Sequence, residues 1–273
     1  MKGISFGQYY PADSIIHKMD PRFKILLAIV FIVATFLCKS AISFLALVCV
    51  GLALIFISKI PLKTIVRSIA PLLFIIAFTV VINIFFGTGE KLLLEVWKIR
   101  IYAEGLWRAL FMFLRIFVLI TSTSIFLTYT TTPMDLTDAL ESLLAPLKLV
   151  HVPVHVFAMM MSITLRFIPT LTEETEKIMN AQKARGADFT SGSLVKRVKA
   201  LIPILIPLFS SAINRATQLA DAMECRCYHG GEGRTRLRVL KYQWFDFAVM
   251  LLMVAFGVGL FFLNRVGIGY VLG

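Results

Sequence analysis

Two arginines stand at matching places in the chain, each within a short run of small residues. The first run is Ala181-Gln182-Lys183-Ala184-Arg185-Gly186 and the second is Ala222-Met223-Glu224-Cys225-Arg226-Cys227. Both runs read Ala-x-x-small-Arg-small, and their arginines are 41 positions apart. A guanidinium group is a planar fork of donors that can pair with a carboxylate through two parallel hydrogen bonds. The repeated run therefore predicts two equivalent docking points for a partner with two-fold symmetry.

A helix end gives a second interpretation of the same residues. An arginine in the last turn of a helix complements the helix dipole, and glycine at the following position is the usual left-handed cap. This interpretation fits Arg185 and Gly186. It fits Arg226 less well, because Cys227 stands where glycine is expected and the next glycine is Gly230.

Other kinds of site have weaker support in the sequence. Cys225, Cys227 and His229 alternate, but alternating side chains at a helix end diverge, and no C-x-x-C pair accompanies them. We therefore expect no metal site. The run Gly230-Gly231-Glu232-Gly233 lacks the spacing of a nucleotide-binding loop, and no catalytic triad or paired carboxylates are visible. We expect no catalytic residue, no cofactor and no ATP hydrolysis by this chain itself.

The composition indicates that a membrane protein carries these residues. Hydrophobic residues make up 58% of the 273 positions and charged residues 16%, with a mean hydropathy of +0.83. Soluble domains average about 45–50% apolar and about 25% charged residues, which argues against a soluble enzyme. The net charge of +12 fits cytoplasmic loops rich in Lys and Arg better than nucleic-acid binding, because no basic module with interleaved aromatic residues is present.

The apolar runs predict an all-α, polytopic membrane protein with about five transmembrane helices and long cytoplasmic coupling helices. The stretch 25–58 contains only one charge, Lys39. As one helix it would be about 50 Å long, against a hydrocarbon core of about 30 Å, so we expect it to fold back at Cys38-Lys39-Ser40. Lys24 is expected to reach the interface with its long side chain. Arg115 lies deep in one span, and the sequence does not identify its partner. The expected spans are 21–38, 41–58, 68–87, 105–129 and 245–263.

A long basic segment between the fourth and fifth spans carries both arginine runs. Five spans place it on the same side as the N-terminus, and its 14 Lys and Arg residues place that side in the cytoplasm. Two of its expected helices begin apolar and end polar, and neither apolar part is expected to be long enough to span comfortably. The expected domains are 1–130 with four transmembrane helices, 131–243 with the coupling helices, and 244–273 with the last transmembrane helix.

The sequence resembles a known family of membrane proteins. The two arginine runs, with Asp221-Ala222-Met223-Glu224 leading into Gly231-Glu232-Gly233-Arg234-Thr235, are similar to the EcfT family of energy-coupling factor (ECF) transporters. The opening segments Tyr10–Ser14 and His17–Lys24 are similar to that family's N-terminus. The resemblance covers nearly the whole chain.

The resemblance implies a non-catalytic coupling subunit of an ABC-type importer in a prokaryotic cell membrane, with its N-terminus in the cytoplasm. Its partners would be two ATPase subunits (EcfA and EcfA'), which bind the ATP, and a substrate-binding S-component for a vitamin or another micronutrient. Arg185 and Arg226 would dock into the ATPases, flanked by Ala184, Gly186, Cys225 and Cys227. The family most often has Ala-Arg-Gly where this chain has Cys225-Arg226-Cys227. The apolar halves of the coupling helices would transmit motion to the S-component, through Met159, Met160, Met161, Ile204, Leu205, Leu208 and Phe209.

Two other classes of protein stay open on the sequence alone. A stand-alone secondary transporter would bind its substrate at the bilayer midplane, where Asn83 and the 121–124 cluster of hydroxyl residues offer limited support. An intramembrane enzyme would need acidic, His or Cys ligands that converge at one depth, and no such set is found. Neither class requires a basic cytoplasmic segment with repeated arginine ends.

Overall fold

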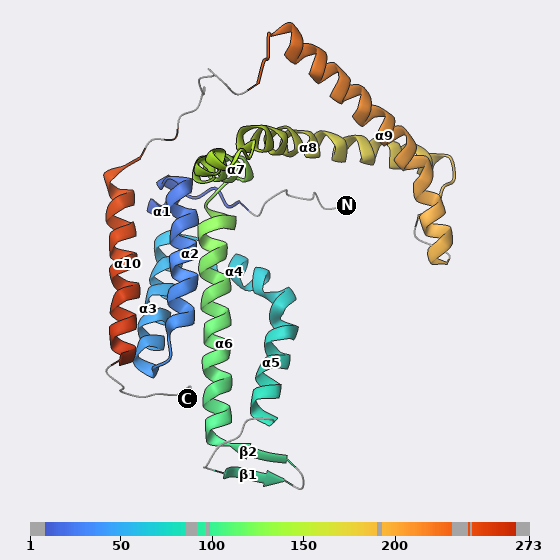
Figure 1. Cartoon of the computed structure of the whole chain (residues 1–273). Helices are drawn as coiled ribbons and strands as arrows, with labels where there is room; N and C mark the ends of the chain where they lie inside the picture. The colour runs from blue at the N-terminus through green and yellow to red at the C-terminus, as the bar shows by residue number, and fades with distance from the viewer. Residues whose placement is uncertain are drawn as a thin grey trace. The chain divides into compact units, whose positions relative to one another are not determined.

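The computed structural model describes residues 9–85, 92–96, 99–189, 193–230, 240 and 242–265. These residues form mostly helices, which confirms the expected fold class (Figure 1). Internal contacts divide the chain into two compact units. The first unit is Met1–Ala139 with Val239–Gly273, and the second is Leu140–Arg238. The arginine runs therefore belong to a different unit from the N-terminal and C-terminal helices.

The first unit is a helical bundle with one short hairpin. Its core lies where α2, α3 and the end of α6 meet, and it includes the fully buried Leu27, Phe44, Leu47 and Ile125. Helix α10 packs along α2 and also contacts α3. The elements are α1 (Ile15–Lys18), α2 (Pro21–Leu37), α3 (Ala41–Ser58), α4 (Leu62–Ile69), η1 (Ala70–Leu72), α5 (Leu73–Phe85), β1 (Leu92–Val96), β2 (Ile99–Tyr102), α6 (Ala103–Thr123), the π-helical η2 (Ser124–Tyr129), α7 (Pro133–Leu143), which continues into the second unit, and α10 (Trp244–Arg265).

The chain folds back between α2 and α3 at the predicted place, and Asn264 of α10 holds this turn. The Asn264 Oδ1 accepts hydrogen bonds from the backbone N–H groups of Lys39 and Ser40, both at 3.2 Å. It also accepts one from the Ser43 hydroxyl at 2.9 Å, while its Nδ2 donates to the Leu37 carbonyl oxygen. The last turn of α10 therefore satisfies backbone groups that the reversal would leave unpaired.

Arg115 of α6 binds the same turn, which gives it the partner that the sequence could not name. Its Nη2 donates to the Cys38 carbonyl oxygen at 2.8 Å, and its guanidinium lies 5.0 Å from the centre of the Phe44 ring. The carbonyl end of α2 carries a partial negative charge, so a cation is stabilising there. Arg115 is thus a structural cap for α2 and a cation–π partner for α3.

The expectation that Lys24 reaches the interface is wrong. Its side chain is 1% exposed, and Nζ donates to the carbonyl oxygens of Thr130 at 2.7 Å and His17 at 3.3 Å. Carbonyls at helix ends have no partner within their own helix. Because Thr130 ends η2 directly beside α2, Lys24 finds its acceptors inside the protein and does not extend to the surface.

Six stretches of the described residues are long and apolar enough to cross a membrane. They include the predicted spans in α3, α6 and α10. Helices α8 and α9 also qualify, although we expected their apolar parts to be too short to span the membrane comfortably. Helix α2, with 17 residues, is slightly shorter than these stretches. The six stretches are Ala41–Ser58, Leu62–Asn83, Glu104–Tyr129, Val154–Ala184, Val195–Cys225 and Trp244–Arg265.

Two segments between the expected spans have secondary structure of their own. Between the spans 41–58 and 68–87, α4 begins directly after Pro61 and carries Lys63 and Arg67 on one helical face. Proline fixes the backbone angle at a helix start, and Pro71 marks the short 3₁₀ turn that leads into α5. Before α6, β1 and β2 pair as an antiparallel hairpin, which no alternation of apolar residues had indicated.

Candidate functional site

Helices α8 (Val154–Ala184) and α9 (Leu194–Cys225) carry the two arginine runs and are in contact with each other (Figure 1). They have 31 and 32 residues, and a short 3₁₀ helix, η3 (Ala145–Val150), precedes α8. Both are continuous helices, although Pro169 lies inside the first and Pro203 and Pro207 lie inside the second. Each run therefore lies at the end of a long helix.

The first run forms a complete Schellman cap at the end of α8. Arg185 is the C-cap residue, and Gly186 takes the left-handed conformation with φ of 88°. The Gly186 N–H donates to the Lys183 carbonyl oxygen at 2.9 Å, and the Ala187 N–H donates to that of Gln182 at 3.0 Å. These are the two hydrogen bonds that define the motif.

The second run forms the same cap at the end of α9. Arg226 is the C-cap residue, the Cys227 N–H donates to the Glu224 carbonyl oxygen at 2.8 Å, and the Tyr228 N–H donates to that of Met223 at 3.0 Å. Cys227 has φ of 55°, so a cysteine occupies the left-handed position. The helix-end interpretation, which fitted Arg226 less well in the sequence, therefore holds at both helix ends.

The two ends are equivalent residue for residue. The arginine, the left-handed residue and both cap hydrogen bonds recur with an offset of 41 positions. All six predicted docking residues are exposed, and within the described part of the chain no ion pair involves Arg185 or Arg226. The structure thus leaves two identically built guanidinium groups exposed at two helix ends.

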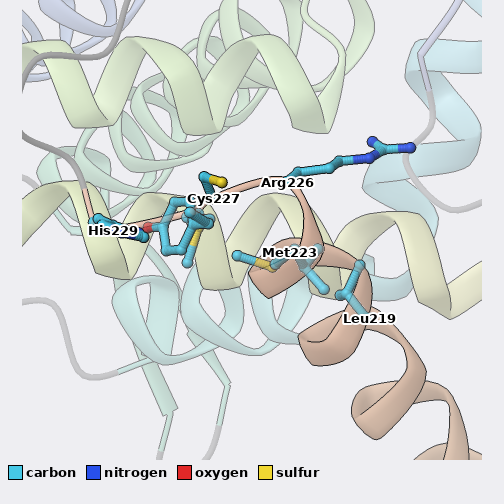
Figure 2. Close-up of a pocket in the computed structure, with 9 residues that line it drawn as sticks. Leu219, Met223, Arg226, Cys227 and His229 are labelled. Atoms are coloured by element: carbon cyan, nitrogen blue, oxygen red, sulfur yellow. The ribbon is translucent and has the colours of Figure 1, made fainter.

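A hollow of about 410 Å³ lies beside the end of α9, between Arg226–Gly230 and the apolar start of α8. Figure 2 shows Leu219 and Met223 on the last turns of α9, while the Arg226 side chain extends away from Cys227 and His229. Met159 and Ile163 of α8 complete the lining. The Arg226 guanidinium is therefore directed away from these two neighbours.

The predicted coupling surface is largely exposed. The exposed fractions are 51% for Met160, 57% for Leu205 and 70% for Phe209, and Met161 is exposed as well. Met159 and Leu208 are half-buried. Ile204 does not belong to this surface, because it is 3% exposed. The apolar halves of α8 and α9 thus present large side chains that no part of the described second unit covers.

One ion pair and one histidine–carboxylate contact of the second unit were not predicted. Arg215 of α9 donates to the Glu174 carboxylate of α8 at 3.0 Å, and His155 of α8 lies 3.0 Å from the Glu141 carboxylate of α7. The first pair has a signal in the sequence, because its members are 41 positions apart, like the two arginines. The second pair has no such signal, since it depends on how the chain turns between α7 and α8.

The described residues contain no cluster of three or more His, Cys, Asp or Glu side chains that could hold a metal ion. Cys225 and Cys227 are exposed free thiols. The glycine-rich segment 231–235, which belongs to the family resemblance, lies outside the described residues.

Comparison with known proteins gives one consistent result. The family model of the cobalt transport protein CbiQ matches residues 12–237. The energy-coupling factor transporter transmembrane protein EcfT of Ruminiclostridium cellulolyticum is 48% identical over 259 residues, covering 94% of this chain and 95% of that protein. The EcfT protein of Lactococcus lactis subsp. cremoris is 46% identical over 266 residues, covering 97% of this chain and 100% of that protein.

Both relatives are similar to this chain over almost its whole length, membrane helices and arginine-tipped helices included. The apolar helices agree with a protein that crosses the membrane several times. The chain belongs to the EcfT family and is a multi-pass transmembrane component of an energy-coupling factor transporter.

Proposed function

We propose that this chain couples ATP hydrolysis by two partner ATPase subunits to uptake of a vitamin or another micronutrient through a separate S-component. One observation carries the proposal: α8 and α9 end in equivalent Schellman caps, each with an exposed arginine at the C-cap position. These two helix ends, at Arg185 and Arg226, are called the arginine tips below. Two equivalent tips suit two related ATPases. The chain itself acts as a lever and hydrolyses no ATP.

Docking would use charge-assisted hydrogen bonds. In each tip the cap hydrogen bonds fix the backbone on both sides of the arginine, so the guanidinium leaves the helix in a defined direction. A carboxylate in a groove of the ATPase can accept two parallel hydrogen bonds from such a group. The small neighbours Ala184 and Gly186 at one tip, and Cys225 and Cys227 at the other, let the groove walls approach closely.

The polar halves of α8 and α9 support a position at the membrane surface, although both helices are long enough to span. Charged side chains are costly in the hydrocarbon region. The second half of α8 carries several of them, and its apolar half precedes them without interruption. We propose that the apolar halves lie against the membrane and the S-component while the tips project into the cytoplasm. The charged residues of α8 beyond its middle are Glu173, Glu174, Glu176, Lys177 and Lys183.

The membrane unit favours a separate substrate-binding subunit over a stand-alone transporter. A cavity of about 200 Å³ lies between α3 and α6, and Thr121 and Ser122 are the polar side chains among its lining residues. Pockets for polar small molecules use several placed polar groups to fix orientation. Two hydroxyls on an otherwise apolar lining offer little to a vitamin, so the specificity is proposed to lie in the S-component.

Affinity purification of the tagged chain in mild detergent tests the docking role. We expect the wild-type chain to carry two ATPase subunits and a small membrane protein. The variant with Arg185→Glu and Arg226→Glu is expected to lose the ATPases and keep the small membrane protein, because like charges would then face the carboxylates of the grooves.

A matched control reverses one exposed lysine on each of the same helices, through Lys177→Glu and Lys196→Glu. This control changes the net charge by the same amount and should retain the ATPases. If the double arginine variant keeps both ATPases, the docking role is wrong. If the wild-type chain is recovered alone and transports a solute in vesicles, it is a secondary transporter.

A further inference from the structure

The spacing of 41 positions between Arg185 and Arg226 also separates a second pair of residues in the two helices. Adding it to Glu174 gives Arg215, and these two side chains contact each other at 3.0 Å. In a two-fold arrangement, equivalent residues contact each other only where they lie on the symmetry axis. The contact is therefore the one expected if a local two-fold axis relates α8 to α9 and passes close to Glu174 and Arg215.

The same offset makes the two helix segments between the ion pair and the arginines equal in length. Each tip arginine lies 11 positions beyond its member of the ion pair, Arg185 beyond Glu174 and Arg226 beyond Arg215. Both segments are continuous α-helix, so each arm is about 16 Å long at about 1.5 Å per residue. The ion pair thus stands at the same distance along the helix from both tips.

The charges make this contact specific to α8 with α9. The axis position holds a carboxylate on one helix and a guanidinium on the other, so two copies of either helix would bring like charges together. The Ser211 hydroxyl, one turn before Arg215, also hydrogen-bonds to Glu174. The side chains are 25% exposed for Glu174 and 38% for Arg215, so the protein partly shields the pair from solvent.

We propose that the Glu174–Arg215 pair is the pivot of the coupling unit, which holds two equal arms at one crossing and thereby sets the distance between the two arginine tips. Glu174 and Arg215 are positioning residues and do not touch the partner. This inference rests on the proposed docking function. It requires a partner that presents two equivalent carboxylate-bearing grooves related by a two-fold axis, at the separation that the pivot imposes.

The distance between the tips tests the pivot directly. Spin labels at Lys183→Cys and Glu224→Cys occupy exposed, equivalent positions beside the two arginines. The background carries Cys49→Ala, Cys225→Ala and Cys227→Gly, and the buried Cys38 is retained. Double electron–electron resonance on the purified full chain, without ATPases, then reports the tip-to-tip distance.

We expect one narrow distance distribution for the starting chain. Glu174→Arg alone and Arg215→Glu alone should each broaden and lengthen it, because like charges then meet at the pivot. The two changes combined restore an opposite pair and should restore the narrow distribution. The neutral variant Glu174→Gln should give an intermediate width, which covers the case in which a charge reversal prevents purification.

The control Glu176→Arg reverses a neighbouring exposed charge of α8 and should leave the distribution narrow. Unchanged distributions in the single and neutral variants would overturn the pivot, and so would a combined variant as broad as the single ones. The same variants are then mixed with the ATPases. For this step the pivot variants carry the native cysteines and no spin labels. Single reversals should reduce ATPase recovery and the combined change should restore it. Normal distances with no ATPase binding by the unlabelled original chain would refute the docking function instead.

Discussion

At the scale of single residues, Cys227 is where the two tips differ most in backbone energy. Both tips need a left-handed residue after the arginine, and Gly186 adopts that conformation freely. A residue with a Cβ atom is disfavoured there by about 1–2 kcal/mol. The hydrogen bonds of the cap nevertheless form at Cys227, so helix-end hydrogen bonding outweighs the local cost.

Cys227→Gly should therefore strengthen the end of α9. The relief of the left-handed cost is partly offset by the larger chain entropy of glycine, about 0.5–1 kcal/mol, which leaves a net gain of roughly 0.5–1 kcal/mol. Hydrogen exchange followed by mass spectrometry should show slower exchange for peptides that cover 219–230. Cys227→Val should speed exchange there, because a β-branched side chain fits this conformation poorly. Equal exchange in all three proteins would contradict this account of the cap.

At the scale of elements, the α2–α3 hairpin depends on groups that come from distant parts of the chain. Asn264 and Arg115 reach the same reversal from α10 and α6. A short helical hairpin needs partners for its free backbone groups, and Cys38 and Ser40 of this turn are buried inside the protein. The last turn of α10 thus stabilises the hairpin that α2 and α3 form.

Asn264→Leu should destabilise the membrane unit, because it removes one donor and an acceptor of three hydrogen bonds without a large change in volume. Backbone groups left unpaired each cost about 1–3 kcal/mol, so we expect a loss of at least about 2 kcal/mol and a lower unfolding temperature in detergent. Asn264→Asp keeps the acceptor and loses the bond to the Leu37 carbonyl oxygen, so its loss of stability should be smaller. Equal unfolding temperatures for both variants and the original chain would show that the contact does not support the hairpin.

The sequence predicts those elements whose cause is local. The length of the 25–58 stretch requires a reversal, and its only charge marks the position where the turn occurs. The arginine runs likewise predict two helix ends. By contrast, the burial of Lys24 depends on the carbonyl of Thr130, and the pairing of Glu174 with Arg215 depends on how two helices cross. Such contacts follow from tertiary packing, which periodicity does not report. The same limit applies to Cys227, where the cap forms without the glycine that sequence rules require.

At the scale of the whole molecule, the chain combines a membrane bundle with a unit that ends in two equivalent tips. The bundle is held by contacts between distant segments, such as those of α10 with α2. The second unit exposes large apolar side chains along its helices and cations at its ends. An exposed apolar surface of this kind faces either lipid or another protein, and the proposed function assigns it to the membrane and the S-component.

The central claim is that each tip holds one ATPase subunit, and counting bound subunits tests it most directly. Native mass spectrometry of the chain with nucleotide-free ATPases should find two subunits on the wild-type chain. We expect one subunit on Arg185→Glu, one on Arg226→Glu and none on the variant with both changes, because the two tips are separate and identically built. Two subunits retained by the double variant would contradict the account.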